Sequence, residues 1–370
     1  MSLFIMKKSL RCYFLIIIIF LSCEKKKEQY FNKIVVDFNT TQEINTSSFI
    51  EHFKIIKLST SNKTLIFRIS KVQYKNGKVF ILDMPGNCIY IFNNSGELEQ
   101  KLSKQGAGPG EYIQLTDFYV ENENLFILDY TQQAIIEYDK DFNFINKIRI
   151  QNFGSSFIHQ NNSYWVYNEP SGKVPDYQFT ALDKKGDKIS DVLSRNSANH
   201  QFNWTGVNVF CINGEEKYLS PRYTDTIYRI TNNNIQPEFY IDFKKRRLPG
   251  KENINNYDIS DPDFSYLIKH NFYISKKYMI FDYIKDMKRY YCIYDRENNM
   301  NVSGSVNNDL IKSFRFFPRW GNDNYLIEEL TPDILINDFS QSPQFKRFID
   351  ITKEDDNPLI IIYKLKEESA

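Results

Sequence analysis

The sequence has no excess of either charge. Its 47 Lys and Arg nearly cancel its 46 Asp and Glu, and short charged runs stand out only at residues 24–28 and 244–247. A nucleic-acid-binding domain needs a strongly basic face. We therefore expect no nucleic-acid partner. The basic run at 244–247 is typical of a solvated surface patch, and near a membrane it can contact phosphate headgroups.

Cysteine is scarce as well. Cys12 and Cys23 lie in the N-terminal segment, which leaves Cys88, Cys211 and Cys292 for the folded part. An odd, widely spaced set does not make a disulfide framework. Each of the three lies in or beside an apolar, strand-like run, so we expect all of them to be buried in the core.

Local catalytic motifs are missing too. Four histidines (His52, His159, His200 and His270) lie in four different segments, with no H-x-x-x-H or H-E-x-x-H spacing, and no G-x-S-x-G elbow occurs. The spacing along the chain therefore indicates no zinc site and no nucleophile elbow. A metal site assembled from separate segments stays open at this stage.

No apolar run is long enough to span a bilayer comfortably. The longest, Cys12 to Ser22, follows the basic segment Met6–Arg11 and ends at Cys23. This N-terminus resembles the lipobox of bacterial lipoproteins, although Phe20 stands where Leu is usual. The resemblance implies a signal peptide over residues 1–23, lipid attachment at Cys23 and a charged tether over residues 24–33. An uncleaved anchor and ordinary secretion are the alternatives.

The folded part is built from a repeated unit. When "NGKVFILDMPGNCIYIFNNSGELEQKL" is laid over "NENLFILDYTQQAIIEYDKDFNFINKI", Asp83 aligns with Asp129, 46 residues later. Short alternating strands closed by Asn, Gly and Asp turns, with a period of 40–50 residues, are typical of propeller blades. Weaker copies begin near residues 163, 217, 277 and 324, which brings the count to six.

The sequence therefore predicts an all-β fold, a six-bladed β-propeller with four-stranded antiparallel blades. It forms a single unit over residues 34–370, with insertions at 244–266 and 331–357. The sixth blade ends at the C-terminus with only three strands, so we expect residues 52–59 to supply its outer strand. Pairing the two ends of the chain in one blade closes the ring and covers an open sheet edge.

The glycine-rich segment "QGAGPGEY" falls between the first two blades. Gly106, Gly108 and Gly110 allow backbone angles denied to other residues, and Pro109 fixes its own φ, so we expect a tight structural crossover. A phosphate-binding loop is excluded, because no helix follows and the P-loop Lys and Ser/Thr are missing.

The segment "VFILDMPGNCIYIFNNSGELEQKLSKQGAGPGEY" resembles an NHL-type repeat. Over residues 34–366 the chain resembles the six-bladed β-propeller lipoproteins of Bacteroidetes, most clearly in the first two blades. The resemblance implies a cell-envelope protein on the periplasmic or cell-surface side of the outer membrane. It supplies no shared catalytic motif.

The loops predict a single working face. Tight turns such as "KNG" and "NNSG" fall on one side of the propeller, and the long connections fall on the other, where binding sites usually lie. We call the second side the long-loop face. Candidate ligand-binding residues on it are Asp83, Asp129 and Asp282 at strand ends, Arg222 for a carboxylate or anionic sugar, and Trp204 and Tyr177 for stacking. A repeated strand-end hydrogen-bonding role is the alternative for the aspartates.

These observations favour a lipid-anchored, non-catalytic propeller that binds a carbohydrate, a peptide or an envelope protein on its long-loop face. No cofactor is predicted, although aspartates around a central channel can hold Ca²⁺. A metal-dependent hydrolase or lyase of the lactonase type is the alternative function, because a propeller hosts both chemistry and recognition. A third possibility is a platform in a larger envelope assembly.

Overall fold

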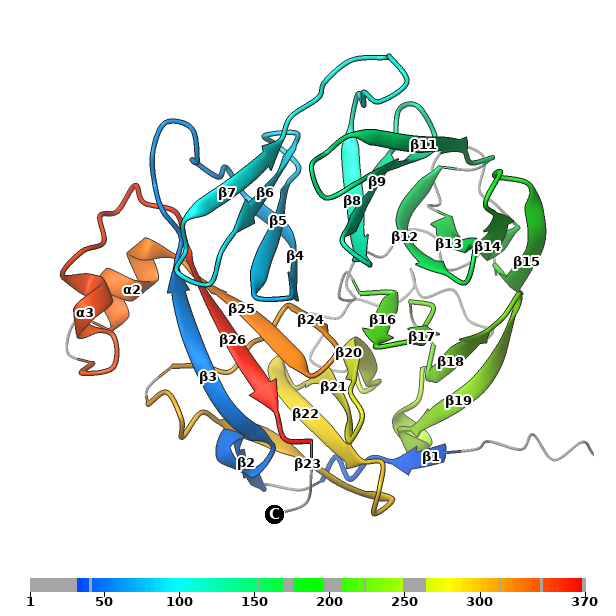
Figure 1. Cartoon of the computed structure of the whole chain (residues 1–370). Coiled ribbons are helices and arrows are strands. Elements are labelled where there is room, and N and C mark those ends of the chain that lie inside the picture. Colours follow the sequence, from blue (N-terminus) through cyan, green and yellow to red (C-terminus); the bar gives the residue numbers. More distant parts are fainter. Residues whose placement is uncertain are drawn as a thin grey trace, which may run out of the picture.

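The protein is a ring of six β-sheets (Figure 1). The computed structural model describes residues 32–39, 42–151, 153–168, 176–195, 208–222, 224–248, 264–312, 314–339 and 342–367. Each sheet contains four antiparallel strands, which follow one another in order from the centre of the ring to its rim. The predicted six-bladed propeller with four-stranded blades is confirmed.

The first three blades each take four consecutive strands of the chain. Blade 1 comprises β4 (Ile69–Lys75), β5 (Lys78–Asp83), β6 (Cys88–Phe92) and β7 (Leu98–Leu102). Blade 2 comprises β8 (Leu115–Glu121), β9 (Asn124–Asp129), β10 (Ala134–Tyr138) and β11 (Phe144–Arg149). Blade 3 comprises β12 (Gly154–Gln160), β13 (Ser163–Asn168), β14 (Tyr177–Asp183) and β15 (Lys188–Ser194).

The other three blades each include a strand from the N-terminal part of the chain. Blade 4 comprises β16 (Phe210–Asn213), β17 (Glu216–Leu219), β18 (Thr226–Thr231), β19 (Asn234–Asp242) and β1 (Asn32–Val35). Blade 5 comprises β20 (Ile268–Ile274), β21 (Tyr278–Lys285), β22 (Lys288–Asp295), β23 (Met300–Asn307) and β2 (Glu43–Asn45). Blade 6 comprises β24 (Trp320–Asn322), β25 (Tyr325–Leu330), β26 (Leu359–Leu365) and β3 (Ile50–Lys57).

Two-residue turns join the first two strands of several blades. Asn76 and Gly77 both have positive φ, 50° and 76°, as do Asn122 and Glu123, at 47° and 67°. Such turns match the twist of the strands that they connect, and Asn and Gly tolerate the left-handed conformation. The local sequence therefore accounts for the tight turns of this face.

The hydrophobic core lies between the blades. One cluster joins Leu82 of blade 1 to Phe118 and Ile127 of blade 2, all with 0% exposure. Another joins Ile227 of blade 4 to Phe281 of blade 5. Cys88, Cys211 and Cys292 are buried and unpaired, as predicted. Because each blade buries both faces against its neighbours, the inner strands are held rigidly around the axis.

The ring closes through the N-terminal strand β3, which pairs antiparallel with β26 in blade 6. The register places Ile55 opposite Ile361 and Lys57 opposite Leu359. This confirms the prediction that the two ends of the chain meet in one blade. The observed strand begins and ends two residues earlier than the predicted range of 52–59.

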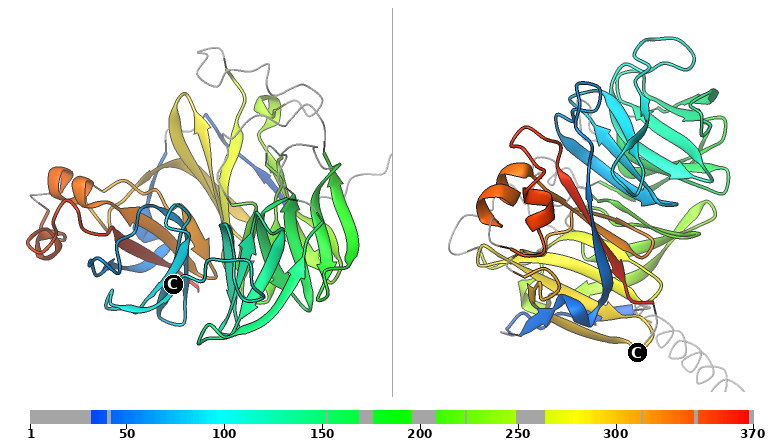
Figure 2. Two further views of the ribbon diagram at one scale, coloured as in Figure 1. Left: turned by 90° about the horizontal axis from the view of Figure 1, so that it is seen from above. Right: turned by 60° about the vertical axis from the view of Figure 1, so that its left-hand side comes forward.

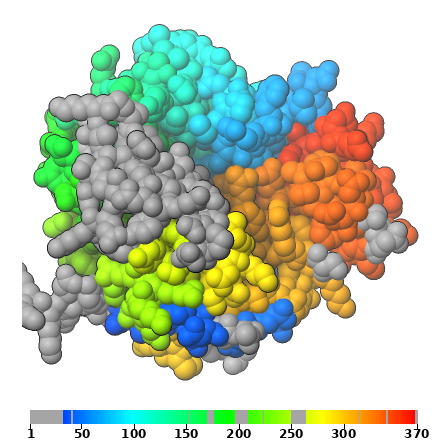
Figure 3. Space-filling view, turned by 180° about the vertical axis from the view of Figure 1, so that it is seen from behind, coloured from blue at the N-terminus to red at the C-terminus, as the bar shows by residue number. Residues whose placement is uncertain are grey.

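The chain before β3 forms two further strands that the sequence analysis did not predict. Strand β1 pairs parallel with β19, and β2 pairs parallel with β23, as fifth strands of blades 4 and 5. We call the described residues from 32 to 57 the N-terminal belt. Figure 3 shows the belt, in blue, at the rim beside the lime-green and orange strands of these blades. Ile34 and Val36 of the belt are fully buried. The belt therefore covers the outer edges of three successive blades.

A close backbone contact holds the belt on blade 5. A Cβ added to Gly304 of β23 would lie 2.1 Å from the carbonyl oxygen of Gln42. We expect Gly304→Ala to displace β2 and to lower the free energy of unfolding by about 1–3 kcal/mol, because the backbones must separate. Urea unfolding and limited proteolysis of the belt measure this effect. Ser305→Ala on the same strand is the control, and an equal stability of the two variants would contradict the prediction.

The crossover between blades 1 and 2 is compact. Gly106 and Gly108 pack around the carboxylate of Glu111, which accepts the backbone N–H of Gly108 at 2.9 Å. A Cβ at Gly110 would lie 2.8 Å from the Cβ of Phe144. Glycine is therefore required here by close packing, as well as by the backbone freedom that the sequence suggests. Pro109 lies in the same turn.

The insertion at 331–357 contains two short helices, α2 (Pro332–Asp338) and α3 (Lys346–Ile349). Leu335, Phe345 and Phe348 are buried against Phe314 and neighbouring core residues. Figures 1 and 2 show both helices outside the ring, beside β3 and β26. The two helices therefore lie at the rim and do not cover the central channel.

Candidate functional site

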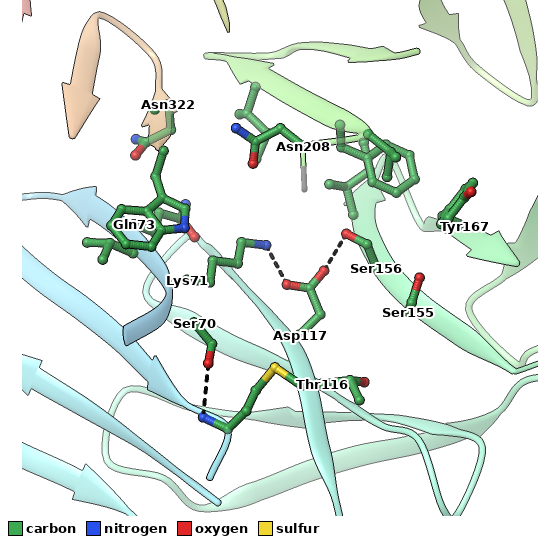
Figure 4. A pocket seen from close by; sticks show the side chains of 18 of the residues that line it. Ser70, Lys71, Gln73, Thr116, Asp117, Ser155, Ser156, Tyr167, Asn208 and Asn322 are labelled. Carbon is green, nitrogen blue, oxygen red and sulfur yellow. Dashed lines mark hydrogen bonds and ion pairs between the residues drawn. The ribbon is translucent and has the colours of Figure 1, made fainter. Parts of the chain in front are cut away.

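A cavity of about 270 Å³ lies at the centre of the propeller. Its walls come from the inner strands β4, β8, β12, β16 and β24 (Figure 4). Most of the lining residues lie at the starts of these strands, and Met84 and Arg222 come from turns between the second and third strands. Both positions belong to the long-loop face, so the pocket lies on the side that the loop lengths predict to be functional.

A repeated β-bulge shapes the pocket wall. The pairing of the inner strand shifts by one residue between Ile69 and Lys71, between Leu115 and Asp117, and between Gly154 and Ser156. In a regular strand, neighbouring side chains point to opposite faces, and a bulge breaks this alternation. Two consecutive side chains from each of three blades therefore line the pocket. They are Ser70 and Lys71, Thr116 and Asp117, and Ser155 and Ser156.

Lys71 and Asp117 form the charged centre of the pocket. The Lys71 ammonium lies 2.6 Å from Oδ1 of Asp117 and 2.8 Å from the carbonyl oxygen of Phe118. The other carboxylate oxygen of Asp117 accepts hydrogen bonds from the Ser156 hydroxyl at 2.6 Å and from the backbone N–H of Phe157 at 2.9 Å. The pair therefore links blades 1, 2 and 3, and Figure 4 shows it facing the cavity.

The opposite end of the channel is crossed by polar contacts between blades. The Gln73 side chain bonds to the backbone N–H and C=O of Val120 at 3.1 and 3.3 Å. Asn322 does the same with the backbone of Tyr74 at 3.1 and 2.8 Å. Asp323 accepts the N–H of Gly214 at 2.7 Å. These bonds draw the inner strands together at the tight-turn face.

Glu121 is the centre of a second polar cluster near that face. It contacts His159 of blade 3 and lies 3.1 Å from the ammonium of Lys217 in blade 4. Burial alone would raise the pKa of Glu121, but the hydrogen bond from His159 and the charge of Lys217 outweigh it and lower the pKa to about 2. Glu121 is therefore ionised and joins three blades.

Arg222, predicted as a ligand residue, lines the pocket. Its guanidinium carbon lies 5.4 Å from the ring centre of Tyr167, another lining residue. Phe210 and Trp320 add further aromatic surface. The structure thus brings one predicted residue together with a charged pair and with aromatic side chains that sequence reasoning did not select.

The predicted aspartates do not line this pocket. Asp83 and Asp129 are fully buried. Asp83 accepts backbone N–H groups of Phe67 at 2.9 Å and Gly86 at 3.0 Å, and Asp129 accepts that of Ile113 at 2.6 Å. Their carboxylates therefore tie the segment before the inner strand to the end of the second strand, as in the alternative structural role.

Asp282 is engaged within the protein as well. Its side chain contacts the guanidinium of Arg289, lies 3.3 Å from Nδ1 of His270, and accepts the backbone N–H of Asn271 at 2.9 Å. Burial, together with the charge of Arg289, lowers the pKa of His270 to about 4. A neutral imidazole beside a paired carboxylate indicates a structural cluster.

Trp204 and Cys23 fall outside the described residues. Tyr177 begins β14, is 41% exposed and does not line the pocket. In the described part of the chain, no helix is long and apolar enough to cross a membrane.

The described residues contain no group of three or more His, Cys, Asp or Glu side chains that could hold a metal ion. Asp117, the acidic residue of the pocket wall, already receives bonds from Lys71, Ser156 and the backbone.

The sequence did carry one signal for the pocket that our prediction did not use. Lys71 and Asp117 stand 46 residues apart, the same offset that relates Asp83 to Asp129. A charged residue at an equivalent position in two successive apolar inner strands is unusual, because such strands are buried. This pattern points to side chains that face the axis.

A family model described as a domain of unknown function, DUF4934, matches residues 31–364. No curated protein matches the sequence. Among solved structures, an exported protein of Bacteroides fragilis has a TM-score of 0.72 at 20% identity, covering 90% of this chain and 99% of its own. A DUF4221 member from Bacteroides vulgatus has a TM-score of 0.53 at 9% identity, covering 86% and 97%.

Virginiamycin B lyase from Staphylococcus aureus is more distant. It has a TM-score of 0.45 at 11% identity and covers 84% of this chain and 99% of its own. At 20% and 9% identity, the two Bacteroides structures show a shared fold and nothing of the ligand.

Proposed function

This chain belongs to the DUF4934 family, and we propose that it is an extracytoplasmic binding protein that holds a carbohydrate or a peptide at the long-loop face of the propeller. The observation that carries this proposal is the central pocket. Its wall combines hydroxyl and amide side chains, such as Ser155 and Asn208, with the aromatic rings of Tyr167 and Phe210. A ligand site typically has a small number of polar groups that point to one place on a rigid, partly apolar wall.

The size of the pocket favours a small ligand or the end of a larger one. Its volume of about 270 Å³ is close to the lower limit of roughly 300 Å³ for common ligand sites. Aromatic rings in such a wall stack on the apolar face of a sugar or on a peptide side chain. The inter-blade hydrogen bonds at the tight-turn face limit how far a ligand enters.

The proposal includes attachment to the cell envelope through lipid on Cys23. The described chain begins at the rim of the propeller, where β1 joins blade 4. A lipid tether that enters at the rim leaves the long-loop face open to ligands. Radiolabelled palmitate incorporation, lost in Cys23→Ala, tests this part of the proposal.

Binding to arrays of glycans and peptides tests the central claim with the purified chain from residue 24 onward. We expect one class of ligand to bind, and Ser155→Trp, which fills the pocket, to weaken that binding at least tenfold. Ser194→Trp, at an exposed rim position, is the matched control and should bind normally. Equal affinities of the two variants would place the site elsewhere.

The metal-dependent hydrolase or lyase has no specific observation in its favour, because the described residues provide no metal-ligand cluster. Elemental analysis of the protein purified without chelator separates the two functions. A metal near one per chain, with an activity that depends on it, would replace the binding proposal.

A further inference from the structure

We propose that a basic patch on blades 4 and 5 binds anionic phospholipid headgroups and holds the propeller against the membrane. The patch comprises the short helix η4 (Lys244–Arg246), the turn between β21 and β22 at residues 285–288, and Phe38 of the N-terminal belt. The inference rests on the proposed location at the cell envelope and adds a contact that is separate from the pocket. No described residue of blade 5 or of η4 lines the pocket.

The two basic segments meet over Phe38. The Lys285 ammonium donates to the carbonyl oxygen of Phe38 at 2.6 Å, and the guanidinium carbon of Arg246 lies 5.2 Å from the centre of its ring. Phe38 is buried and belongs to the same core cluster as Phe243 and Tyr283. The left view of Figure 2 shows η4, in lime green, and the yellow hairpin of β21 and β22 projecting on the same side of the ring. The belt therefore fixes the two segments as one surface.

Positive charges outnumber negative charges in this surface. Arg247 and Arg289, at its margin, form ion pairs with buried aspartates. Two exposed acidic residues, Asp37 and Asp286, lie in the same segments. Within the described part of the chain, no ion pair involves the five other cations, which are Lys244, Lys245, Arg246, Lys285 and Lys288. Charge complementarity therefore favours an anionic partner.

The tip of the hairpin points to a membrane as that partner. Lys285 lies directly opposite Lys288, and like charges in this arrangement destabilise a sheet. Met287 has a φ of 58°, at a turn position where Gly or Asn is usual, and is 72% exposed. Anionic headgroups offset the repulsion between the lysines, and the membrane interface takes up the apolar side chain. A soluble anion provides only the first of these contacts.

The N-terminal chain brings the patch close to the proposed lipid. Residues 24–31 lie between Cys23 and β1. The nine steps along the chain from Cys23 to Asn32 span at most about 32 Å, and the six steps from Asn32 to Phe38 span at most about 22 Å. An extended tether is therefore longer than the distance from its end to the patch. The lipid and the patch can lie in one membrane surface, and a lipid combined with basic residues gives stable attachment.

Vesicle flotation tests this inference with the chain from residue 24 onward, which contains every described strand. We expect binding to vesicles of equal parts phosphatidylglycerol and phosphatidylcholine at low ionic strength, and none to phosphatidylcholine alone. Added salt should release the protein. Each lysine near an anionic surface contributes about fivefold. We therefore expect binding about a hundredfold weaker in the triple variant Lys244→Gln/Lys245→Gln/Lys288→Gln.

The matched control removes the same charge from the opposite face. Lys140, Lys184 and Lys185 are exposed and lie in tight turns between the outer strands of blades 2 and 3. The triple variant Lys140→Gln/Lys184→Gln/Lys185→Gln should bind anionic vesicles as the wild type does. Far-UV circular dichroism verifies that both triple variants are folded.

Met287→Gly separates membrane contact from stability. Glycine adopts positive φ readily, so urea unfolding should show at least the stability of the wild type. Vesicle binding should weaken about tenfold, because the apolar side chain is lost. Unchanged vesicle binding in this variant would overturn the assignment to a membrane interface.

The remaining outcomes separate this inference from the proposed function. No binding to anionic vesicles, equal binding to both kinds of vesicle, or an equal loss in the control variant would overturn it. Binding to heparin without binding to vesicles would assign the patch to another polyanion and overturn it as well. Glycan and peptide arrays test the pocket independently. If palmitate is not incorporated but vesicle binding persists, the lipid on Cys23 is removed from the proposal and the patch remains the membrane contact.

Discussion

Replacing Glu121 with alanine is expected to lower the free energy of unfolding by about 3 kcal/mol at neutral pH. Glu121 contacts His159, accepts the Tyr119 hydroxyl at 3.0 Å and lies 3.1 Å from Lys217. The Lys217 side chain is only 3% exposed. Removing the carboxylate leaves that ammonium buried without its counter-ion, which is far more costly than the loss of an exposed ion pair.

The same residue predicts part of the acid sensitivity. Because His159 and Lys217 lower the pKa of Glu121 to about 2 against the opposing effect of burial, the folded state favours the ionised carboxylate more than the unfolded state does. This stabilisation is present above pH 4.5, the ordinary value, and is lost as the pH falls toward 2. The Glu121→Ala variant lacks this contribution, so its stability should change less between pH 5 and pH 3.

Urea unfolding at pH 7, 5 and 3 measures both effects. Glu99→Ala is the matched control, because the carboxylate of Glu99 lies 2.8 Å from Lys78 on the surface, with side chains 34% and 45% exposed. An exposed pair contributes less than about 1 kcal/mol. If Glu121→Ala proves no less stable than Glu99→Ala, the contacts of Glu121 between the blades do not contribute to the free energy of unfolding.

Replacing Glu328 with glutamine is expected to stabilise the protein at alkaline pH. Glu328 lies in β25, is 2% exposed and accepts the backbone N–H of Phe317 at 2.9 Å. Burial raises the pKa of Glu328 to about 8 from 4.5. The folded state therefore keeps the proton over a pH range in which the unfolded chain has already lost it.

Because of this difference, the stability of the folded state falls as the pH rises. The stability associated with the protonated carboxyl is complete below pH 4.5 and is lost as the pH rises to about 8. At about 1.4 kcal/mol per pH unit, the loss amounts to roughly 4–5 kcal/mol. Glutamine is neutral throughout and keeps the acceptor for Phe317. Glu328→Gln should therefore match the wild type near pH 5 and exceed it by about 4 kcal/mol at pH 9.

Denaturant titrations at pH 5, 7 and 9 provide the measurement. Glu354→Gln, at an exposed position in the same insertion as α3, should follow the wild-type pH profile. A wild-type protein that stays equally stable from pH 5 to pH 9 would show that Glu328 does not resist ionisation in the folded state.

The blade repeat was predictable because its signals are local. Alternation of apolar residues, Asn and Gly at positive φ, and the recurrence of Asp83 at Asp129 depend on neighbours in the chain and on one period. The pairing of β3 with β26 was predictable for a different reason. A three-stranded last blade leaves an open edge, and one unused strand was available to cover it.

The belt strands β1 and β2 could not be inferred in the same way. Each has only four or three residues, and each pairs in parallel with a strand more than 200 residues away. No local period or turn marks such a partner. The pairing depends on where the chain happens to pass on its way to β3.

The candidate site shows the same division. Loop lengths indicated the face on which the pocket lies, and the departure from the aspartate pattern indicated Arg222, which lines that pocket. Asp83 and Asp129 are buried, and their carboxylates bond to backbone N–H groups that precede the inner strands. Sequence position alone does not distinguish a strand-end carboxylate that faces a ligand from one that faces its own backbone.

The sequence by itself determined the six-bladed propeller, the closure of its ring and the face with long loops, since these follow from period, turn chemistry and the need to cover sheet edges. Only the tertiary structure decided which side chains meet at the axis. The bulges in β4, β8 and β12 turn pairs of neighbouring residues toward the pocket and bring Lys71, Asp117 and Ser156 into hydrogen-bonding distance. That convergence depends on contacts between three blades, which no single stretch of sequence encodes.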